Sequence, residues 1–182
     1  GANGKVYTWV APVNGVKQGR FEPAIFLVTP KKQQILNMGL DIALSKTTQL
    51  MAEGAMSNYD VNLFSSLGKA NRTGFATKLQ LKNTQPISST KKGLRIITDA
   101  GFEWVEAKFK PLERLRNIEF TRDWGLPLQV VQQDERIITA GTQLADSKNN
   151  SIRYQFTNYH RGDGFTGLRN SVYQMQQVKN WR

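Results

Sequence analysis

The chain is dominated by segments in which apolar and polar residues alternate. In residues 34–46, Leu36, Met38, Leu40, Ile42 and Leu44 recur at every second position. Because successive side chains of a β-strand point to opposite faces, this run predicts a strand with one apolar and one polar face. The alternation returns in residues 73–82, 94–109 and 152–157, whereas helical spacing is not sustained for three turns anywhere. The pattern therefore predicts an all-β protein.

Short polar segments separate these runs and predict the connections between strands. Residues 46–47 read as a tight turn, residues 146–151 and 161–166 as hairpin ends, and residues 62–72 and 83–93 as longer loops. Because short connections cannot carry the chain across a sheet into a parallel strand, we expect an antiparallel meander of about eight to ten strands. We expect one domain over residues 1–182, consistent with a segment of a longer protein.

The length of the predicted strands bears on how the sheet is built. Several span about 10–15 residues, against five or six in most globular sheets. Long strands with one apolar face favour a barrel-like wall of the outer-membrane type. A soluble β-sandwich or a broad sheet over one core remains the alternative, because it gives the same alternation. The two differ in whether one apolar band faces outward or into a core; its residues are Leu36, Met38, Leu40, Phe75, Leu79, Phe102 and Trp104.

Composition narrows the chemistry more than it identifies a function. The 182 residues include no cysteine and one histidine, His160, which excludes disulfide scaffolds, thiolate metal sites and multi-histidine metal centres. The sequence contains no run of 18 apolar residues, so it predicts no transmembrane helix. There are 25 Lys and Arg residues against 14 Asp and Glu, for a formal net charge of +11. The charge indicates an anionic partner without naming one.

Three stretches resemble a known family. Residues 51–65 read MAEGAMSNYDVNLFS, residues 102–126 read FEWVEAKFKPLERLRNIEFTRDWGL, and residues 151–170 read SIRYQFTNYHRGDGFTGLRN. They resemble the strand–turn–strand units of large, uncharacterised outer-membrane β-barrel-type surface proteins of Bacteroidetes. The resemblance implies an outer-membrane or cell-surface location and a structural, ligand-binding or transport role without catalysis. It transfers no catalytic residue to this chain.

A cluster of arginines and carboxylates near the middle of the chain is the candidate ligand-binding region. If residues 118–124 are extended, Arg122 and Trp124 share one face while Glu119 and Asp123 share the other. Arginine forks and a tryptophan surface suit an acidic ligand or a sugar phosphate, although a polar ladder that fixes strand register is the favoured interpretation. The candidate ligand-binding residues, including two lysines of a basic turn, are Arg114, Arg116, Glu119, Arg122, Asp123, Trp124, Lys91 and Lys92.

The basic charge favours envelope polyanions, either lipid or polysaccharide, over nucleic acid. The lysines are dispersed over turns instead of forming the single stripe typical of nucleic-acid binding. We expect no cofactor and no metal. Asn58, Asp60, Asn62 and Ser65 offer oxygen ligands, yet they lack the acidic density of a calcium loop and are typical of turns.

Two further motifs carry weaker alternatives. Glu103 with Glu106, or Glu119 with Asp123, could form the carboxylate pair of a hydrolase, but such pairs are common by chance. Residues 161–163 read Arg-Gly-Asp, a tripeptide typical of adhesion motifs that also suits a hairpin turn. We therefore expect a non-catalytic envelope protein. The alternative is a soluble periplasmic or secreted β-sandwich that binds carbohydrate or another polyanion.

Overall fold

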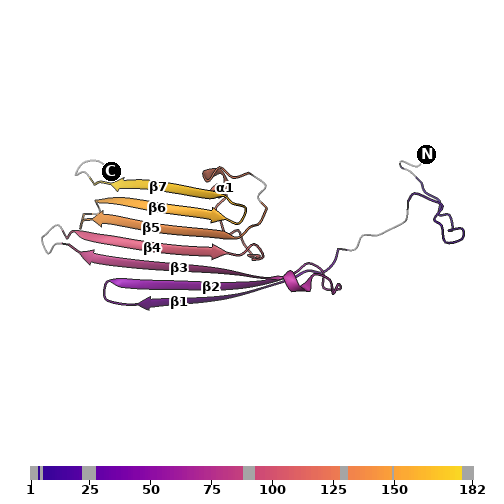
Figure 1. Cartoon of the computed structure of the whole chain (residues 1–182), viewed down its shortest axis with the longest axis horizontal. Coiled ribbons are helices and arrows are strands. Elements are labelled where there is room, and N and C mark those ends of the chain that lie inside the picture. The colour runs from indigo at the N-terminus through magenta and orange to yellow at the C-terminus, as the bar shows by residue number, and fades with distance from the viewer. Residues whose placement is uncertain are drawn as a thin grey trace.

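One antiparallel sheet organises the protein (Figure 1). The computed structural model describes residues 4, 6–21, 28–87, 93–127, 131–148 and 150–177. The strand order equals the chain order, so each strand pairs with its sequence neighbour. The elements are β1 (Lys32–Ala43), β2 (Thr48–Asp60), the 3-10 turn η1 (Lys69–Asn71), β3 (Thr73–Pro86), β4 (Arg95–Val105), the one-turn helix α1 (Phe120–Asp123), β5 (Glu135–Ala145), β6 (Ser151–Arg161) and β7 (Thr166–Met175).

The predicted all-β antiparallel meander is confirmed, but the barrel-like closure is wrong. The sheet has seven strands and is open, with β1 and β7 at opposite edges. Six interstrand spacings separate these edges by about 29 Å along the sheet, so they cannot exchange backbone hydrogen bonds. The described residues also contain no second sheet. Of the two alternative architectures, the structure therefore agrees with the broad sheet and not with the sandwich. No helix among the described residues is long and apolar enough to cross a membrane.

The expected eight to ten strands are too many, because individual strands are longer than the alternation indicated. β3 runs on to Pro86, and β2 spans 13 residues. Residues 106–127 contain no strand at all. The turns predicted at residues 46–47, 146–151 and 161–166 are confirmed, whereas residues 83–86 of the loop expected at 83–93 belong to β3 and residues 88–92 lie outside the described residues. At the first turn, Ser45 and Thr48 exchange backbone hydrogen bonds of 3.2 and 3.4 Å. The Asp146 side chain likewise accepts a 2.8 Å hydrogen bond from the Lys148 amide in the β5–β6 turn.

The Arg-Gly-Asp tripeptide forms the turn between β6 and β7. Gly164, one residue further on, has a φ of 90°, a conformation that glycine adopts without strain. Arg161 is 3% exposed, and its guanidinium binds Asp163 at 2.9 Å and the Val131 carbonyl at 3.1 Å. The arginine is therefore an internal part of the hairpin and is not displayed on the surface.

The strand register separates apolar from charged side chains across the whole sheet. One row of paired residues reads Leu40, Ala52, Leu79, Phe102 and Ile138 from β1 to β5. We call this side the apolar face; its larger side chains include Leu36, Met38, Leu40, Ile42, Leu50, Met56, Phe75, Leu79, Leu81, Ile96, Phe102, Trp104, Ile138, Leu144, Ile152, Tyr154, Phe156, Leu168 and Val172. The opposite side, the polar face, carries Asp41, Glu53, Lys78, Lys82, Arg95, Asp99, Glu103, Glu135, Arg153, Arg161 and Arg169.

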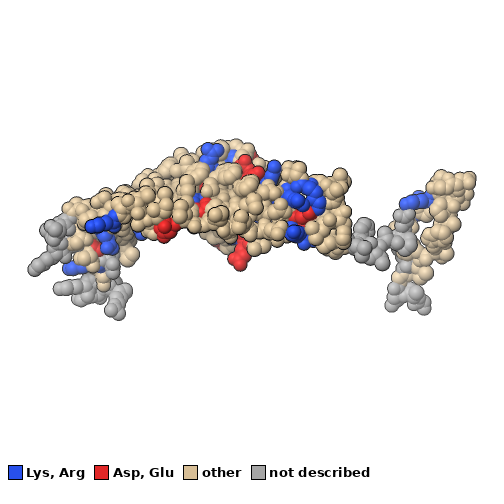
Figure 2. Space-filling view, turned by 90° about the horizontal axis from the view of Figure 1, so that it is seen from below, with Lys and Arg blue, Asp and Glu red and all other residues tan. Residues whose placement is uncertain are grey.

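The apolar face is not covered by any described part of the chain. Met38 is 72% exposed, Leu40 57% and Leu168 65%. The total accessible surface is 14689 Å², whereas a globular monomer of 20.6 kDa exposes about 8,900 Å². The open sheet, whose apolar face has no described layer over it, contributes to this excess. Figure 2 views the molecule from the β1 edge, where the sheet is a thin, arched layer.

The small core lies on the polar face, beneath the segment that connects β4 to β5. Val105 and Phe109 are 6% and 3% exposed, and Tyr159 is fully buried. Gly74 of β3 lies directly under the backbone of Lys108 and Phe109, so closely that a β-carbon there would overlap it. This contact requires glycine, because any side chain would lift the segment off the sheet.

We expect Gly74→Ala to release this segment. The new methyl group would meet main-chain atoms, which cannot turn away, so the free energy of unfolding should fall by about 2 kcal/mol or more. Gly54→Ala on the neighbouring strand is the control, because nothing lies within 4 Å of its β-carbon position. Trypsin cleavage after Lys108 or Arg114 should accelerate in the first variant only. Equal cleavage rates in both variants would contradict the packing described.

Candidate functional site: a groove on the polar face

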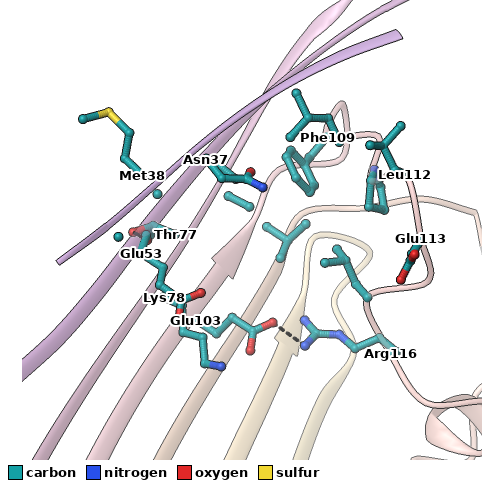
Figure 3. A pocket seen from close by; sticks show the side chains of 18 of the residues that line it. Asn37, Met38, Glu53, Thr77, Lys78, Glu103, Phe109, Leu112, Glu113 and Arg116 are labelled. Atoms are coloured by element: carbon teal, nitrogen blue, oxygen red, sulfur yellow. Dashed lines mark hydrogen bonds and ion pairs between the residues drawn. The ribbon is translucent and has the colours of Figure 1, made fainter. Parts of the chain in front are cut away.

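A groove of about 680 Å³ lies between the polar face of β1–β4 and residues 109–116 (Figure 3). Its apolar wall includes Ile35, Ala55, Ala76, Val105, Phe109, Leu112 and Leu115. Its charged lining consists of Glu53, Lys78, Glu103, Glu113, Arg114 and Arg116. The groove therefore combines an apolar side with charges of both signs, which suits an extended amphipathic ligand more than a simple anion.

Arg116 ties the segment above the groove to two strands. Its guanidinium forms ion pairs with Glu103 of β4 and with Glu135 of β5, the latter at 3.0 Å. The Arg116 side chain is 20% exposed, and its guanidinium carbon lies 5.1 Å from the Phe120 ring centroid. Figure 3 shows the guanidinium pointing toward Glu103 across the groove. Partial burial strengthens both charge-assisted hydrogen bonds relative to surface pairs.

Tyr159 is the centre of an aromatic cluster next to this ion pair. Its ring lies 5.2 Å from those of Phe120 and Trp124 and 5.7 Å from that of Phe165. Its hydroxyl donates a 2.9 Å hydrogen bond to Glu135. Burial, reinforced by this carboxylate, raises the pKa of Tyr159 well above its usual value. The tyrosine therefore stays neutral and holds Glu135 in position.

Trp124 is an anchor of the segment and is not a free stacking surface. Its ring atoms occupy the space beside Gly167, where a β-carbon would come within 2.6 Å of them. Arg169 lies over the ring, with its guanidinium carbon 4.4 Å from the centroid, and donates a 2.7 Å hydrogen bond to the Asp123 carbonyl. The stacking role predicted for Trp124 toward a ligand is thus taken by Arg169 of the same chain.

The segment expected to be extended at residues 118–124 is a short helix instead. The Asp123 amide bonds to the Glu119 carbonyl at 2.8 Å, and Gly125 ends the turn with a φ of 64°. No strand pairs with this segment, so its backbone groups satisfy each other locally. Glu119 and Arg122 consequently form an exposed pair at 2.7 Å along the helix, and the expected polar ladder between strands is absent here.

The predicted site residues do not gather into one site. Arg114 is exposed at the groove, Arg116 points inward, and the Glu119–Arg122 pair faces outward. Lys91 and Lys92 lie outside the described residues. Of the six that the structure describes, only Arg114 and Arg116 line the groove. The proposed hydrolase pair Glu103 and Glu106 is occupied, because Arg116 binds the first and the Phe75 amide donates to the second at 3.0 Å.

An ion pair that crosses three strands could not be read from the sequence. Arg153 of β6 binds Asp99 of β4 through two parallel hydrogen bonds of 2.8 and 3.0 Å. The pair passes over Gly141 of β5, where a β-carbon would come within 2.9 Å of both partners. The available signal is a glycine inside the strand, between Ala140 and Thr142. This glycine identifies the ion pair only when the pairing of β4, β5 and β6 is known, and the sequence alone does not give that register.

The oxygen-rich segment after β2 is a turn, as expected. The Asp60 side chain accepts a 3.1 Å hydrogen bond from the Asn62 amide, and the Asn62 side chain accepts one of 3.0 Å from the Phe64 amide. Asp60 also binds the Lys69 ammonium and, at 3.2 Å, the Arg72 guanidinium. The hydrogen bond from Lys69 is the main cause that lowers the pKa of Asp60. Within the described ranges, no three His, Cys, Asp or Glu residues are placed to hold a metal ion.

No family model, curated protein or solved structure matches the chain. The resemblance to outer-membrane proteins of Bacteroidetes therefore stays a prediction, and the candidate site is described by its own geometry.

We expect Arg116→Gln to loosen the segment over the groove. The substitution leaves Glu103 without its arginine and Glu135 with only the more distant Arg161 at 3.9 Å, which should lower the free energy of unfolding by about 1–2 kcal/mol. Arg114→Gln removes the same charge from an exposed side chain that binds no described residue, and should change stability by less than about 0.5 kcal/mol. Urea unfolding followed by tryptophan fluorescence measures both. Equal effects would mean that Arg116 contributes only its charge.

Proposed function

We propose that this chain forms part of the wall of a non-catalytic β protein in the outer membrane or at the cell surface. The observation that carries the proposal is the uncovered apolar face. A monomer in water rarely exposes a continuous apolar patch above a few hundred Å². In contact with lipid hydrocarbon, the same face is satisfied without any second layer of protein.

The placement of charges supports contact with lipid. Within the seven described strands, the Lys, Arg, Asp and Glu residues that share the parity of the apolar face are Lys32, Asp60 and Arg136. Each lies at the first or last residue of its strand or next to it. A lysine or arginine facing lipid at the bilayer midplane costs about 2–4 kcal/mol, while the cost near the headgroups is small. The central rows of this face carry none of these residues.

Strand length also fits the thickness of a bilayer. Tilted membrane strands need about 9–11 residues to cross the hydrocarbon core. The shortest strand, β7, has 10 residues and the longest, β3, has 14. Both therefore exceed or match the span, whereas strands of ordinary soluble sheets average about five or six residues.

The polar face fits the interior of such a protein. It carries the Asp99–Arg153 and Arg116–Glu135 ion pairs, and the segment of residues 106–127 folds over it. Placed in a barrel, the groove under this segment opens to the interior and gives the wall a ligand-binding or transport role beside its structural one. Because the sheet is open, further strands of a longer protein or of other chains would complete the wall at β1 and β7.

Anionic envelope components are the proposed partners. The net charge of +11 favours lipid headgroups or polysaccharide, and we propose neither nucleic-acid binding nor a cofactor. The soluble alternative, a secreted sandwich that binds carbohydrate, requires a second sheet that the described residues lack. The membrane proposal is therefore the one to test first.

We expect the chain to float with phosphatidylcholine vesicles in a density gradient, and Leu79→Arg to reduce the floating fraction at least about tenfold. The arginine would lie in the central row of the apolar face, where its transfer into hydrocarbon is unfavourable. Gln80→Arg, on the same strand and the polar face, should float like the natural chain.

The two variants add the same charge one residue apart, so a difference between them reports the face alone. Recovery of the natural chain as a monodisperse monomer that stays at the bottom of the gradient would reject the membrane proposal. Equal flotation of both variants would show that charge attracts the chain to vesicles without insertion.

A further inference from the structure

A second cavity, of about 690 Å³, lies at the end of the sheet where β2 meets β3. Its walls come from the loop of residues 61–72 and from residues 107–110 of the segment over the polar face. Its charged lining consists of Asp60, Lys69, Arg72, Lys108 and Lys110. We call this the basic pocket. It shares no lining residue with the groove described above.

The basic pocket holds more positive charge than its single carboxylate neutralises. Asp60 binds both Lys69 and Arg72, so one carboxylate serves two cations. Lys110 donates to the neutral Gln132 side chain and keeps its charge uncompensated. Lys108 is exposed and forms no hydrogen bond or ion pair with any described residue. Concentrated positive charge without counter-charge is unfavourable unless an anion or solvent ions compensate it.

Two of the cations, Lys69 and Arg72, are held in place by a buried carboxylate. The Asp60 side chain is 7% exposed and fixes the positions of the Lys69 and Arg72 head groups. Lys69 also donates a 3.0 Å hydrogen bond to the Asn62 carbonyl. On the opposite wall, the fully buried Ser57 accepts a 2.8 Å hydrogen bond from the Lys110 amide. The Lys69 and Arg72 head groups therefore lose little conformational entropy when a ligand binds, which favours binding, whereas the Lys108 side chain has still to be ordered.

We propose that the basic pocket binds a phosphate group. The cavity is surrounded by one guanidinium and several ammonium groups. Phosphate oxygens accept charge-assisted hydrogen bonds from donors of both kinds. The cavity exceeds the volume of one phosphate, so the group can belong to a larger molecule.

The position of the basic pocket agrees with a lipid headgroup as one source of this phosphate. Asp60 lies four residues beyond Met56, the last large side chain that β2 contributes to the apolar face, which places the pocket about 14 Å past that row. At such a distance from the hydrocarbon, basic side chains meet phosphate headgroups. The lipid source rests on the proposed function, whereas binding of phosphate itself does not.

The first experiment titrates the full chain with inorganic phosphate, by calorimetry and by ³¹P NMR at constant ionic strength. We expect saturable binding that Lys108→Gln weakens at least about fivefold, the loss of one charge-assisted contact. Arg72→Gln should weaken it similarly. Lys148→Gln is the control, because it removes one charge from the opposite end of the sheet and should change binding less than about twofold.

Lys108→Gln is also the variant least able to disturb folding, since its side chain contacts no described partner. Absence of saturable binding, or equal weakening by Lys148→Gln, would overturn the proposal. The second experiment adds phosphatidic acid to phosphatidylcholine vesicles and measures flotation. Flotation that increases with phosphatidic acid and depends on Lys108 assigns the phosphate to lipid. Phosphate binding without that dependence assigns it to a soluble phosphate ester. Failure of flotation with phosphate binding intact rejects the membrane proposal and leaves this site standing.

Discussion

A single β-sheet has two faces, and this chain covers only part of one of them. Hydrophobic burial in a globular domain requires a second layer, either another sheet or helices packed on the first. Here the covering layer is the segment of residues 106–127, and it lies over charged and aromatic side chains of the polar face. The apolar face therefore depends on something outside the described chain, and the function proposed above starts from that dependence.

The separation of the two faces depends in turn on the register. Each strand pairs antiparallel with the next, and the pairing continues without a shift from β1 to β7. A slip of one residue at any pair would exchange the faces of all later strands. The Asp99–Arg153 pair opposes such a slip, because its geometry is met only when Gly141 lies between the two partners. By fixing the register, the Asp99–Arg153 ion pair on the polar face thus keeps charged side chains off the apolar face.

The features predictable from the sequence are those set by local periodicity. The alternation around Leu40 and Leu79 identified strands, the apolar band and the meander, because side-chain direction in a strand needs no tertiary information. An extended conformation for residues 118–124 is compatible with their sequence but wrong, because the segment has no strand partner and folds through contacts of Trp124 with Tyr159 and Gly167. The basic pocket cannot be predicted from the sequence, because its cations come from two distant parts of the chain.

The covering segment has a mechanical consequence for the arched sheet. It is seated on Gly74 of β3 at one point and on Gly167 of β7 at another, and it crosses the strands between them. Those seats are four strand spacings apart, about 19 Å along the sheet. A segment that is held at two points across a curved sheet opposes flattening of the sheet, because flattening would change the distance between those points. The curvature of this part of the sheet is therefore constrained by contacts within the chain itself.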